Sequence, residues 1–399
     1  MPQIWAGVDA GKAHHHCVVI DGQGGKLLSR RVANDEQALL ELIADVRALD
    51  PDAQWAIDLN SGGAALLIAL LLGSGQKLFY IPGRTVHHAS GAYRGDGKTD
   101  AKDAAVIADQ ARMRRDLQPL RVEEDIAGDL RILTARRYNL AADRTRAINR
   151  LRAQLLEYFP ALERAFDYSV SKAALRLLTG YQTPSGLRRM GQARLAGWLK
   201  ARGVRNAPSV AATALEAADA QHSTVPGEAL AAAMVVRLAK EVMDLDKEIA
   251  EIARLIEARY CEHRHAEVIA SMPGFGPLLG AEFIALTGGN LDAFASPDRL
   301  AAVAGLAPVP RDSGRVSGNL RRPRRYSRRL LRVFYISAQV AAVHCPVSKQ
   351  FYERKRAEGK GHKQAILALA RHRLNVLWAL IRDNRKFEPH PPTPLPAAT

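Results

Sequence analysis

Two aspartates, Asp100 and Asp103, stand three residues apart where a polar loop runs into the alanine-rich stretch AKDAAVIADQARM. Positions i and i+3 of a helix share one face, so both carboxylates are expected on the same side of a first helical turn. Like charges held together repel each other unless a cation lies between them, although acids are also favoured at helix N-termini in their own right. The pair therefore predicts either a metal-binding helix start or an ordinary solvated one.

Two further acids end short apolar runs in the N-terminal third of the chain. The run IWAGVDAGK places Asp9 at the tip of a predicted strand, and QWAID places Asp58 at the end of another. The segments around them predict the order β-β-β-α-β-α-β-α, with a hairpin turn at Asp21–Gly25 and Asn34 as the N-cap of the first helix. Because ligands of open α/β sheets gather at strand ends, these acids are expected near one edge of the sheet.

The four carboxylates of Asp9, Asp58, Asp100 and Asp103 are thus candidates for a single site. Magnesium takes oxygen ligands, usually one or two carboxylates from the protein, and completes its shell with phosphate and water. Two-metal sites built in this way suit in-line displacement at phosphorus. The residues therefore predict a Mg²⁺ site for chemistry on phosphate esters.

Strand-Asp, strand-acid and the K-T-D-x-x-D-A helix resemble the ribonuclease H-like, RuvC-like domain of the DEDD-type insertion-sequence transposases. That group includes the bridge-RNA-guided recombinases. The resemblance extends over about residues 4–385, and it implies that Asp9, Asp58, Asp100 and Asp103 are the metal-binding, catalytic acids. The family usually has Glu at the second position, so the shorter Asp58 implies either a closer strand or a metal held through water.

The charge balance favours a polyanionic partner. The chain has 57 Lys and Arg against 41 Asp and Glu, a formal net charge of +16, although charge alone does not separate nucleic acid from a membrane surface. No run approaches the ~20 apolar residues of a membrane-spanning helix, and no secretory signal precedes the first strand. The three scattered cysteines favour neither a disulfide framework nor a zinc site. We therefore expect a bacterial cytoplasmic protein, associated with the nucleoid and without a membrane partner.

The adjacent histidines His14, His15 and His16 fall within a predicted strand. Consecutive strand residues alternate faces, so these three side chains cannot all bind one metal. We interpret them as surface or partner-contacting residues.

The resemblance divides the chain into a RuvC-like metal-binding domain (1–120), a helical, coiled-coil linker region (121–265), a mainly α-helical transposase domain (266–385) and a disordered, proline-rich tail (386–399). Within the linker region, an arginine-rich amphipathic helix is predicted at its start and a second long helix at its end. The second helix has apolar residues alternating four and three apart, which is a heptad seam.

The seam runs from Leu238 to Ile256 and leaves two interpretations open. The two helices pack together within one chain, or the seam holds protomers together. The resemblance favours assembly into a homo-oligomer, a dimer or a tetramer. Between the helices, residues 166–226 predict a small helical insertion with no recognisable chemistry.

The predicted transposase domain opens on the turn MPGFG between two helical segments, a helix-hairpin-helix-like pattern. Gly274 and Gly276 in this turn would let backbone N–H groups approach a phosphate. Further on, Ser296 is the predicted N-cap of a helix that has Pro297 at its first position.

The densest basic run of the chain, RDSGRVSGNLRRPRRYSRRLLR, contains nine arginines and a single acid, Asp312. Such a run neutralises phosphates and gives strongly salt-dependent binding. Apolar helical segments on both sides favour a folded surface over a solvated tail. The residues expected to contact nucleic acid are Arg315, Arg321, Arg322, Arg324, Arg325, Arg328 and Arg329.

Ser313, followed by a glycine within this run, is a chemically suitable nucleophile because guanidinium groups stabilise charge that develops at phosphorus. In the family the catalytic serine lies in an S-G dipeptide after A-G-L-x-P, which implies Ser313 here. Ser317 repeats the dipeptide and is the competing candidate. Tyr326, which replaces a glycine of the family pattern, is the third.

We therefore expect a DNA recombinase that mobilises an insertion sequence through an Mg²⁺-dependent acidic cluster and a nucleophilic serine. The resemblance implies donor and target DNA as partners, together with a structured non-coding guide RNA. Three alternatives stay open from the residues: a metal-only, RuvC-like Holliday-junction resolvase or nuclease with water as nucleophile, a sugar-kinase-like ATPase, and a catalytically inert nucleic-acid-binding protein.

Overall fold

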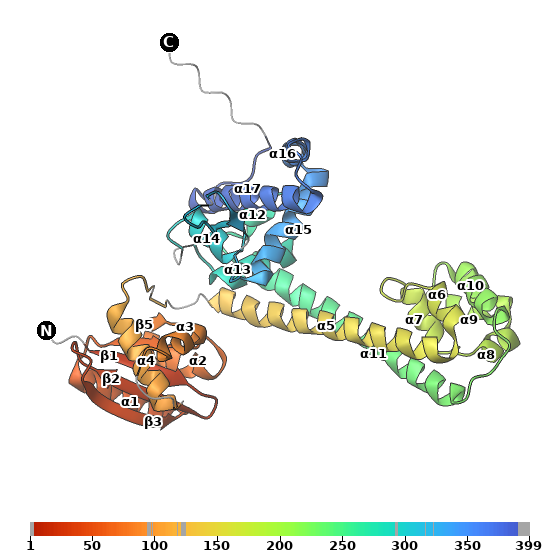
Figure 1. The fold of residues 1–399 in the computed structure, drawn as a ribbon. Helices are drawn as coiled ribbons and strands as arrows, with labels where there is room; N and C mark the ends of the chain where they lie inside the picture. Colours follow the sequence, from red (N-terminus) through yellow and green to blue (C-terminus); the bar gives the residue numbers. More distant parts are fainter. Residues whose placement is uncertain are drawn as a thin grey trace, which may run out of the picture. The chain divides into compact units, whose positions relative to one another are not determined.

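The computed structural model describes residues 4–93, 97, 99–117, 119–120, 125–291, 294–315, 317–321 and 323–389. The chain divides into two compact units, Met1–Glu123 and Glu124–Thr399, and each is described by itself. The N-terminal unit is an α/β domain, whereas the described part of the C-terminal unit is helical apart from one short hairpin (Figure 1).

A five-stranded mixed sheet with the order β3-β2-β1-β4-β5 forms the centre of the N-terminal unit. The strands are β1 (Trp5–Ala10), β2 (His14–Ile20), β3 (Lys26–Ala33), β4 (Gln54–Ile57) and β5 (Lys77–Tyr80). The first three strands form an antiparallel meander, while β4 runs parallel to β1 and β5 runs parallel to β4. Parallel neighbours need crossover connections, and helices supply them here.

Helices cover both faces of this sheet. The helices are α1 (Glu36–Leu49), α2 (Ala65–Gly73), which a short 3₁₀ turn η1 (Gly62–Ala64) precedes, α3 (Gly83–Ser90) and α4 (Asp100–Met113). One apolar core lies between the sheet and α1 with α2, and a second core lies between the sheet and α3 with α4. The predicted β-β-β-α-β-α-β-α order is confirmed, with α3 as an additional helix.

The two local predictions around β3 have different outcomes. The turn after β2 is confirmed, because the Asp21 carboxylate accepts the backbone N–H groups of Gln23 and Gly25 at 2.8 Å. The prediction that Asn34 caps α1 is wrong. Asp35 is the N-cap and accepts the Ala38 N–H, while the Asn34 amide ties two loop carbonyls together. Both residue types are favoured caps, so the neighbour one position along was equally eligible.

Helix α4 crosses β1 at Gly7 with its backbone almost in contact with the strand. A Cβ atom at Gly7 would lie 2.3 Å from the Ala104 carbonyl oxygen and 2.3 Å from the Ala108 nitrogen. Only a residue without a side chain permits this approach. The contact fixes the N-terminal turn of α4 over the ends of the central strands.

Two helices of 34 residues each, α5 (Asp125–Tyr158) and α11 (Glu228–Cys261), pair along their length in the C-terminal unit. Ion pairs join Arg136 to Glu248 and Arg259 to Asp129, which makes the two helices antiparallel. Seam residues of α11 such as Val242 and Ile256 are buried. The pairing of the two helices within one chain is therefore observed, and a further role of the seam in assembly stays a prediction.

Separate apolar cores lie at the two ends of this helix pair (Figure 1). At one end is the insertion, whose helical body includes α6 (Pro160–Ala165), before the predicted start at residue 166, together with α7 (Lys172–Leu178), α8 (Pro184–Met190), α9 (Gln192–Lys200) and α10 (Ala207–Asp219). At the other end is the C-terminal domain, which consists of α12 (Ala266–Ala270), α13 (Pro277–Thr287), α14 (Pro297–Val303), β6 (Val309–Pro310), β7 (Leu320–Arg321), α15 (Arg328–His344), α16 (Pro346–Ala357) and α17 (His362–Arg382). The predicted Ser296 cap and Pro297 start of α14 are confirmed.

No single helix in the described ranges is both long and apolar enough to cross a bilayer. Helices α15 and α16 meet that test only when they are taken together, and they are bent by 100° relative to each other. The inward side of α15 supplies Leu330, Val333 and Phe334 to the core of the C-terminal domain.

The contact at Gly7 generates a stability prediction. A Gly7→Ala substitution forces α4 away from β1 and should lower the free energy of unfolding by about 1–3 kcal/mol, the usual cost of overpacking. The control is Gly73→Ala at the end of α2, where an added Cβ meets nothing within 4 Å. The measurement is the urea-unfolding midpoint of the intact chain, together with hydrogen exchange of the α4 amides. Equal midpoints for the two variants would contradict the close approach.

Candidate metal centre and nucleic-acid interface

The ends of β1 and β4 place Asp9 and Asp58 side by side. In the parallel register, the residue before Asp9 pairs with the residue before Asp58, so the two aspartates leave neighbouring strands together. Gly7 faces α4 and side chains alternate along a strand, so Asp9 projects toward α4 as well. The backbone N–H of Ala10 donates to Asp58 Oδ1 at 3.0 Å and holds that carboxylate at the strand end.

Helix α4 brings the second pair of acids to the same edge. Thr99 caps the helix by accepting the Lys102 N–H at 3.1 Å, so Asp100 and Asp103 lie in its first turn as predicted. The negative charge of Asp103 acts on Asp58, and that of Asp100 acts on His16 of β2. His16 lies opposite Asp9 in the antiparallel register. The structure therefore gathers all four predicted acids around the ends of β1 and β4.

The pKa of Asp58 is affected by burial and by the nearby acid Asp103. Burial raises the pKa of Asp58 above its ordinary value, and the neighbouring Asp103 raises it further, while the hydrogen bond from Ala10 acts in the opposite direction. Asp58 forms no ion pair with a Lys or Arg among the described residues. The carboxylate thus lies in a half-buried, negatively charged setting that a bound cation would relieve.

The donor set fits a hard divalent cation in chemical type, because every candidate ligand is a carboxylate oxygen. Within the described ranges, however, no three acidic, His or Cys side chains already form a cage around one point. Asp100 is exposed at the outer end of the helix turn, whereas Asp9, Asp58 and Asp103 are partly buried. The residues therefore fit a hard divalent cation by the chemistry of their ligands.

The interpretation of the histidines as surface residues is wrong for His15. Its side chain is 1% exposed, because strand alternation turns it to the face opposite His14 and His16. Burial lowers the pKa of His15, while Asn34 and Asp58 act to raise it. His15 thus belongs to the support beneath the acid cluster, and the sequence signal that could have identified it is its alternation with buried Cys17 and Val19.

Ser313 lies at the tip of the β6–β7 hairpin and is exposed. The hairpin is closed by the Arg311 N–H, which donates to the Asn319 carbonyl at 2.9 Å, and by the Asn319 N–H, which donates to Asp312 Oδ1 at 3.0 Å. Ser317, the competing candidate, is exposed on the same tip. The hairpin thus presents both serines, and its only acid is engaged in closing the loop.

Tyr326 has a packing role that its place in the sequence did not reveal. Its ring lies against Gly305, where an added Cβ would come within 2.5 Å of the ring and where φ is +68°. The next residue, Ser327, caps α15 by accepting the Leu330 N–H at 3.2 Å. The segment that departs from the family pattern therefore serves to begin α15.

The arginines of the basic run point in different directions. Arg322 lies outside the described residues, and the exposed members are Arg311, Arg315, Arg321, Arg324, Arg325, Arg328 and Arg332. Arg329 is turned inward, 3.7 Å from the buried carboxylate of Glu282 and over the ring of Tyr138. Glu282 also pairs with Arg332 at 2.9 Å. Sequence reasoning missed Glu282, although it is the only charge in the apolar helix PLLGAEFIALT.

The two glycines of the MPGFG turn differ in their surroundings. Gly274 has φ +80° and packs against α15, where an added Cβ would lie 2.6 Å from the Ser337 carbonyl oxygen. The buried Arg373 of α17 donates to the Pro273 carbonyl and to Ser337 Oγ, which locks the turn in place. Gly276 is exposed and precedes α13, with open space around it. Gly274 therefore has a packing reason of its own, and Gly276 faces solvent.

Two family models match the chain. One is described as "Transposase", carries the DEDD label and covers residues 6–160. The other is described as "Transposase IS116/IS110/IS902 family" and covers residues 266–353. The first match contains the acids and α4, and the second contains the MPGFG turn, the hairpin and α15.

Curated relatives are similar over nearly the whole chain. The "Insertion element IS900 uncharacterized 42 kDa protein" of Mycobacterium paratuberculosis is 66% identical over 397 residues, which cover 99% of each chain. The "Insertion element IS116 uncharacterized 44.8 kDa protein" of Streptomyces clavuligerus is 52% identical, covering 98% of this chain and 97% of that protein. Among solved structures, "T. thermophilus RuvC in complex with Holliday junction substrate" is 16% identical with a TM-score of 0.24, covering 30% of this chain and 99% of that one.

The setting of Asp58 predicts a pH dependence. Its folded pKa is raised, so its contribution to stability is present below the unfolded pKa and is lost as pH rises through the folded pKa. Asp58→Asn removes the ionisable group, so the variant does not lose stability in this way, and the amide oxygen still accepts the Ala10 N–H. Without divalent metal, the variant should therefore gain stability relative to wild type as pH rises to neutrality. Unfolding midpoints in EDTA measure this gain, with the exposed Asp52→Asn as control; a gain that shrinks with rising pH would contradict it.

The inward position of Arg329 predicts that the arginines of the run divide into two classes. Arg329→Ala removes one of the two cations beside the buried Glu282 carboxylate and should lower the free energy of unfolding by about 0.5–3 kcal/mol. Arg325→Ala, at an exposed position, should leave stability within about 0.5 kcal/mol and reduce the salt dependence of nucleic-acid binding. Denaturant unfolding and binding at several salt concentrations measure both effects. A stable Arg329→Ala variant with weakened binding would place Arg329 on the interface instead.

Proposed function

This chain belongs to the IS116/IS110/IS902 family of insertion-sequence transposases, and from this premise we propose how it cuts and rejoins DNA. Its N-terminal unit is the RuvC-like, ribonuclease H-like domain of that family. The observation that carries the proposal is the convergence of four acids at one sheet edge, together with a serine presented on a basic hairpin.

We assign Asp9, Asp58, Asp100 and Asp103 as the residues that hold Mg²⁺. The metal, when bound, neutralises charge on the scissile phosphate and its leaving oxygen. Asp9 and Asp58 fix the position on rigid strand ends, and the first turn of α4 supplies the other carboxylates above them. Support comes from the raised pKa of Asp58, which burial causes first and to which the negative charge of Asp103 adds.

We assign Ser313 as the nucleophile. Its Oγ attacks phosphorus, the bond from phosphorus to the leaving DNA oxygen breaks, and the serine proton ends on that leaving hydroxyl. The new serine–phosphate–DNA linkage is itself a phosphodiester, so rejoining needs no further energy source. A second DNA hydroxyl then attacks this phosphorus, and the bond from phosphorus to the serine oxygen breaks. A serine hydroxyl is a weak nucleophile at its free pKa, so it requires the acidic site for activation. Exposed arginines around the hairpin, among them Arg315, would hold the phosphate in position.

The proposal extends to partners. Donor and target DNA are the substrates, and a structured non-coding RNA is the guide that the family resemblance implies. Recombination cuts and exchanges several strands, so we propose that two or four copies of the chain act together. The charge of +16 supports binding of either nucleic acid.

Trapping the covalent intermediate tests the assignment. Ser313→Ala should lose the protein–DNA adduct and at least about a thousandfold in recombination rate, the scale of removing a nucleophile, while DNA binding persists. Ser317→Ala is the matched control on the same hairpin and should keep substantial activity. Asp100→Asn should lose cleavage and keep binding. The measurement is capture on cleavable DNA, followed by mass spectrometry of the modified peptide.

Each other outcome has a distinct meaning. An adduct on Ser317 or Tyr326 would overturn Ser313 and keep covalent recombination. Cleavage without any adduct would favour a metal-only nuclease with water as the nucleophile. Full activity of Asp100→Asn would remove that residue from the site.

A further inference from the structure

The helical insertion contains a long stretch without a single acid. Between residues 168 and 215 there is no Asp or Glu. The eight cationic residues of that stretch are Lys172, Arg176, Arg188, Arg189, Arg194, Lys200, Arg202 and Arg205. The whole chain, by contrast, has 41 Asp and Glu against 57 Lys and Arg. The stretch therefore carries an unbalanced positive charge on one small folded body.

Only part of this charge is used inside the insertion. Arg188 points inward and donates to the carbonyls of Ala218 and Gln221. Arg194 donates to the Met190 carbonyl at 2.8 Å and so caps the end of α8. In the described part of the chain, none of the eight cationic residues pairs with a carboxylate within 4.0 Å. Their positive charges are thus available to an external anion.

Three of the arginines surround a continuous surface that we name the Trp198 face, defined by Tyr181, Arg189, Arg194, Trp198 and Arg202. Arg189 and Arg194 line an open hollow of about 370 Å³, whose other walls include Tyr181. The Tyr181 ring contacts the Trp198 ring edge-on, with centroids 5.1 Å apart. The Arg202 guanidinium lies 3.8 Å from the centre of the Trp198 ring. These contacts join the arginines across one side of α8 and α9.

We propose that the Trp198 face binds the phosphate backbone of duplex DNA, away from the site of strand cleavage. Arginine side chains without carboxylate partners attract phosphate, and their binding gives affinity that depends on salt rather than on sequence. A second copy of the same face is a poor partner, because like charges would meet. The insertion, for which the sequence predicted no chemistry, would then have a function in DNA binding.

The packing of the aromatic side chains favours duplex over single-stranded nucleic acid as the partner. Proteins that hold single strands stack bases on open aromatic rings. Here Tyr181 and Trp198 are packed against each other, and Arg202 covers the face of Trp198. Arg202 thus occupies a face of Trp198 on which a base would otherwise stack, and guanidinium groups are presented beside it. The arrangement therefore fits a stacked duplex contacted through its phosphates.

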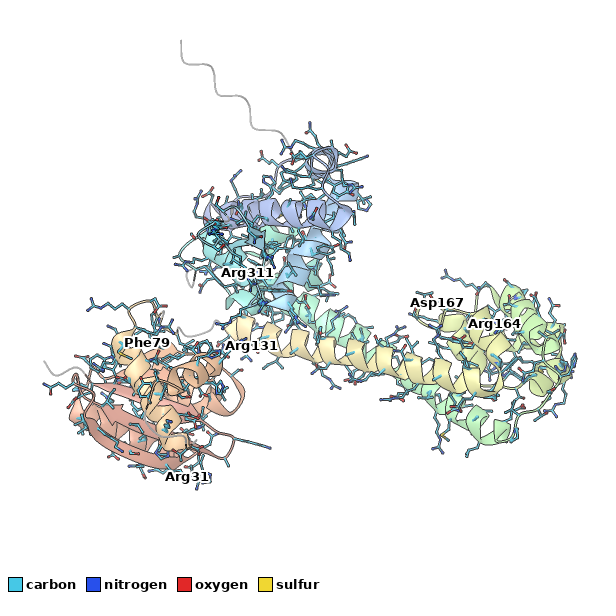
Figure 2. The ribbon with its side chains drawn as sticks, viewed as in Figure 1. Arg31, Phe79, Arg131, Arg164, Asp167 and Arg311 are labelled. Atoms are coloured by element: carbon cyan, nitrogen blue, oxygen red, sulfur yellow. The ribbon has the colours of Figure 1, made fainter. Side chains whose placement is uncertain are left out.

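The test uses the intact chain with Arg189→Glu plus Arg202→Glu. The matched control is Arg146→Glu plus Arg164→Glu, which changes the net charge equally on α5 and α6; Arg164 and the acid Asp167 are both marked on the insertion in Figure 2. The probe is duplex DNA of scrambled sequence in EDTA, titrated at several salt concentrations. The slope of log affinity against log salt should fall by about two in the test variant, since each phosphate contact contributes about 0.9.

Several outcomes would overturn the proposal. An unchanged slope and affinity would remove the Trp198 face from DNA binding. An equal loss in the control would make the effect one of net charge alone. A loss confined to RNA of the same length would reassign the partner. If the Glu variant does not keep the wild-type unfolding midpoint, Arg189→Gln plus Arg202→Gln repeats the test with a slope change of the same sign. Because EDTA suppresses metal-dependent cleavage, the result is independent of whether Ser313 is the nucleophile.

Discussion

The close approach of α4 to β1 at Gly7 is the constraint on which the acid cluster depends. The absence of a side chain at Gly7 lets the helix backbone lie on the strand, near the Ala104 carbonyl. The first turn of α4 then lies over the strand ends from which Asp9 and Asp58 emerge. A larger residue would separate the carboxylates of Asp9 and Asp58 from those of the first turn of α4. The absence of a side chain at Gly7 therefore determines whether these four acids can lie close together.

Buried charge has a comparable organising role in the C-terminal domain. Glu282 lies within an apolar helix, and its carboxylate holds Arg329 and Arg332 of α15. Arg373, which is 2% exposed, fixes the turn that contains Gly274 through the Pro273 carbonyl. Burial lowers the pKa of Arg373 to about 10, so it stays charged at neutral pH. These internal pairs determine which arginines remain outside for nucleic acid.

The parts of this molecule that sequence predicts well are those set by short-range periodicity. Strand alternation and the i, i+3 spacing were sufficient to place Asp9 and Asp103, and local capping chemistry identified Ser296. The Asn34 cap prediction failed because the adjacent Asp35 was equally eligible. The other failures concern choices that distant residues make. His15 is buried by packing on the sheet face opposite α4, and Arg329 turns inward because Glu282, far away in sequence, attracts it. No local pattern around Arg329 contains Glu282, so no local argument could have identified that contact. The burial of His15 did have a local signal, its alternation with Cys17 and Val19.

The distribution of charge explains why binding and chemistry need separate elements. A cluster of carboxylates repels the phosphate on which it is proposed to act, so it contributes nothing to holding DNA until a cation offsets its charge. The attraction has to come from elsewhere, and we propose that the exposed arginines near the β6–β7 hairpin and the Trp198 face supply it. On these surfaces the cations lack nearby acids: Asp312 is engaged in closing the hairpin, and residues 168–215 contain none. The hairpin surface thus combines many arginines with one engaged acid, whereas the Trp198 face depends mainly on the absence of acids around it.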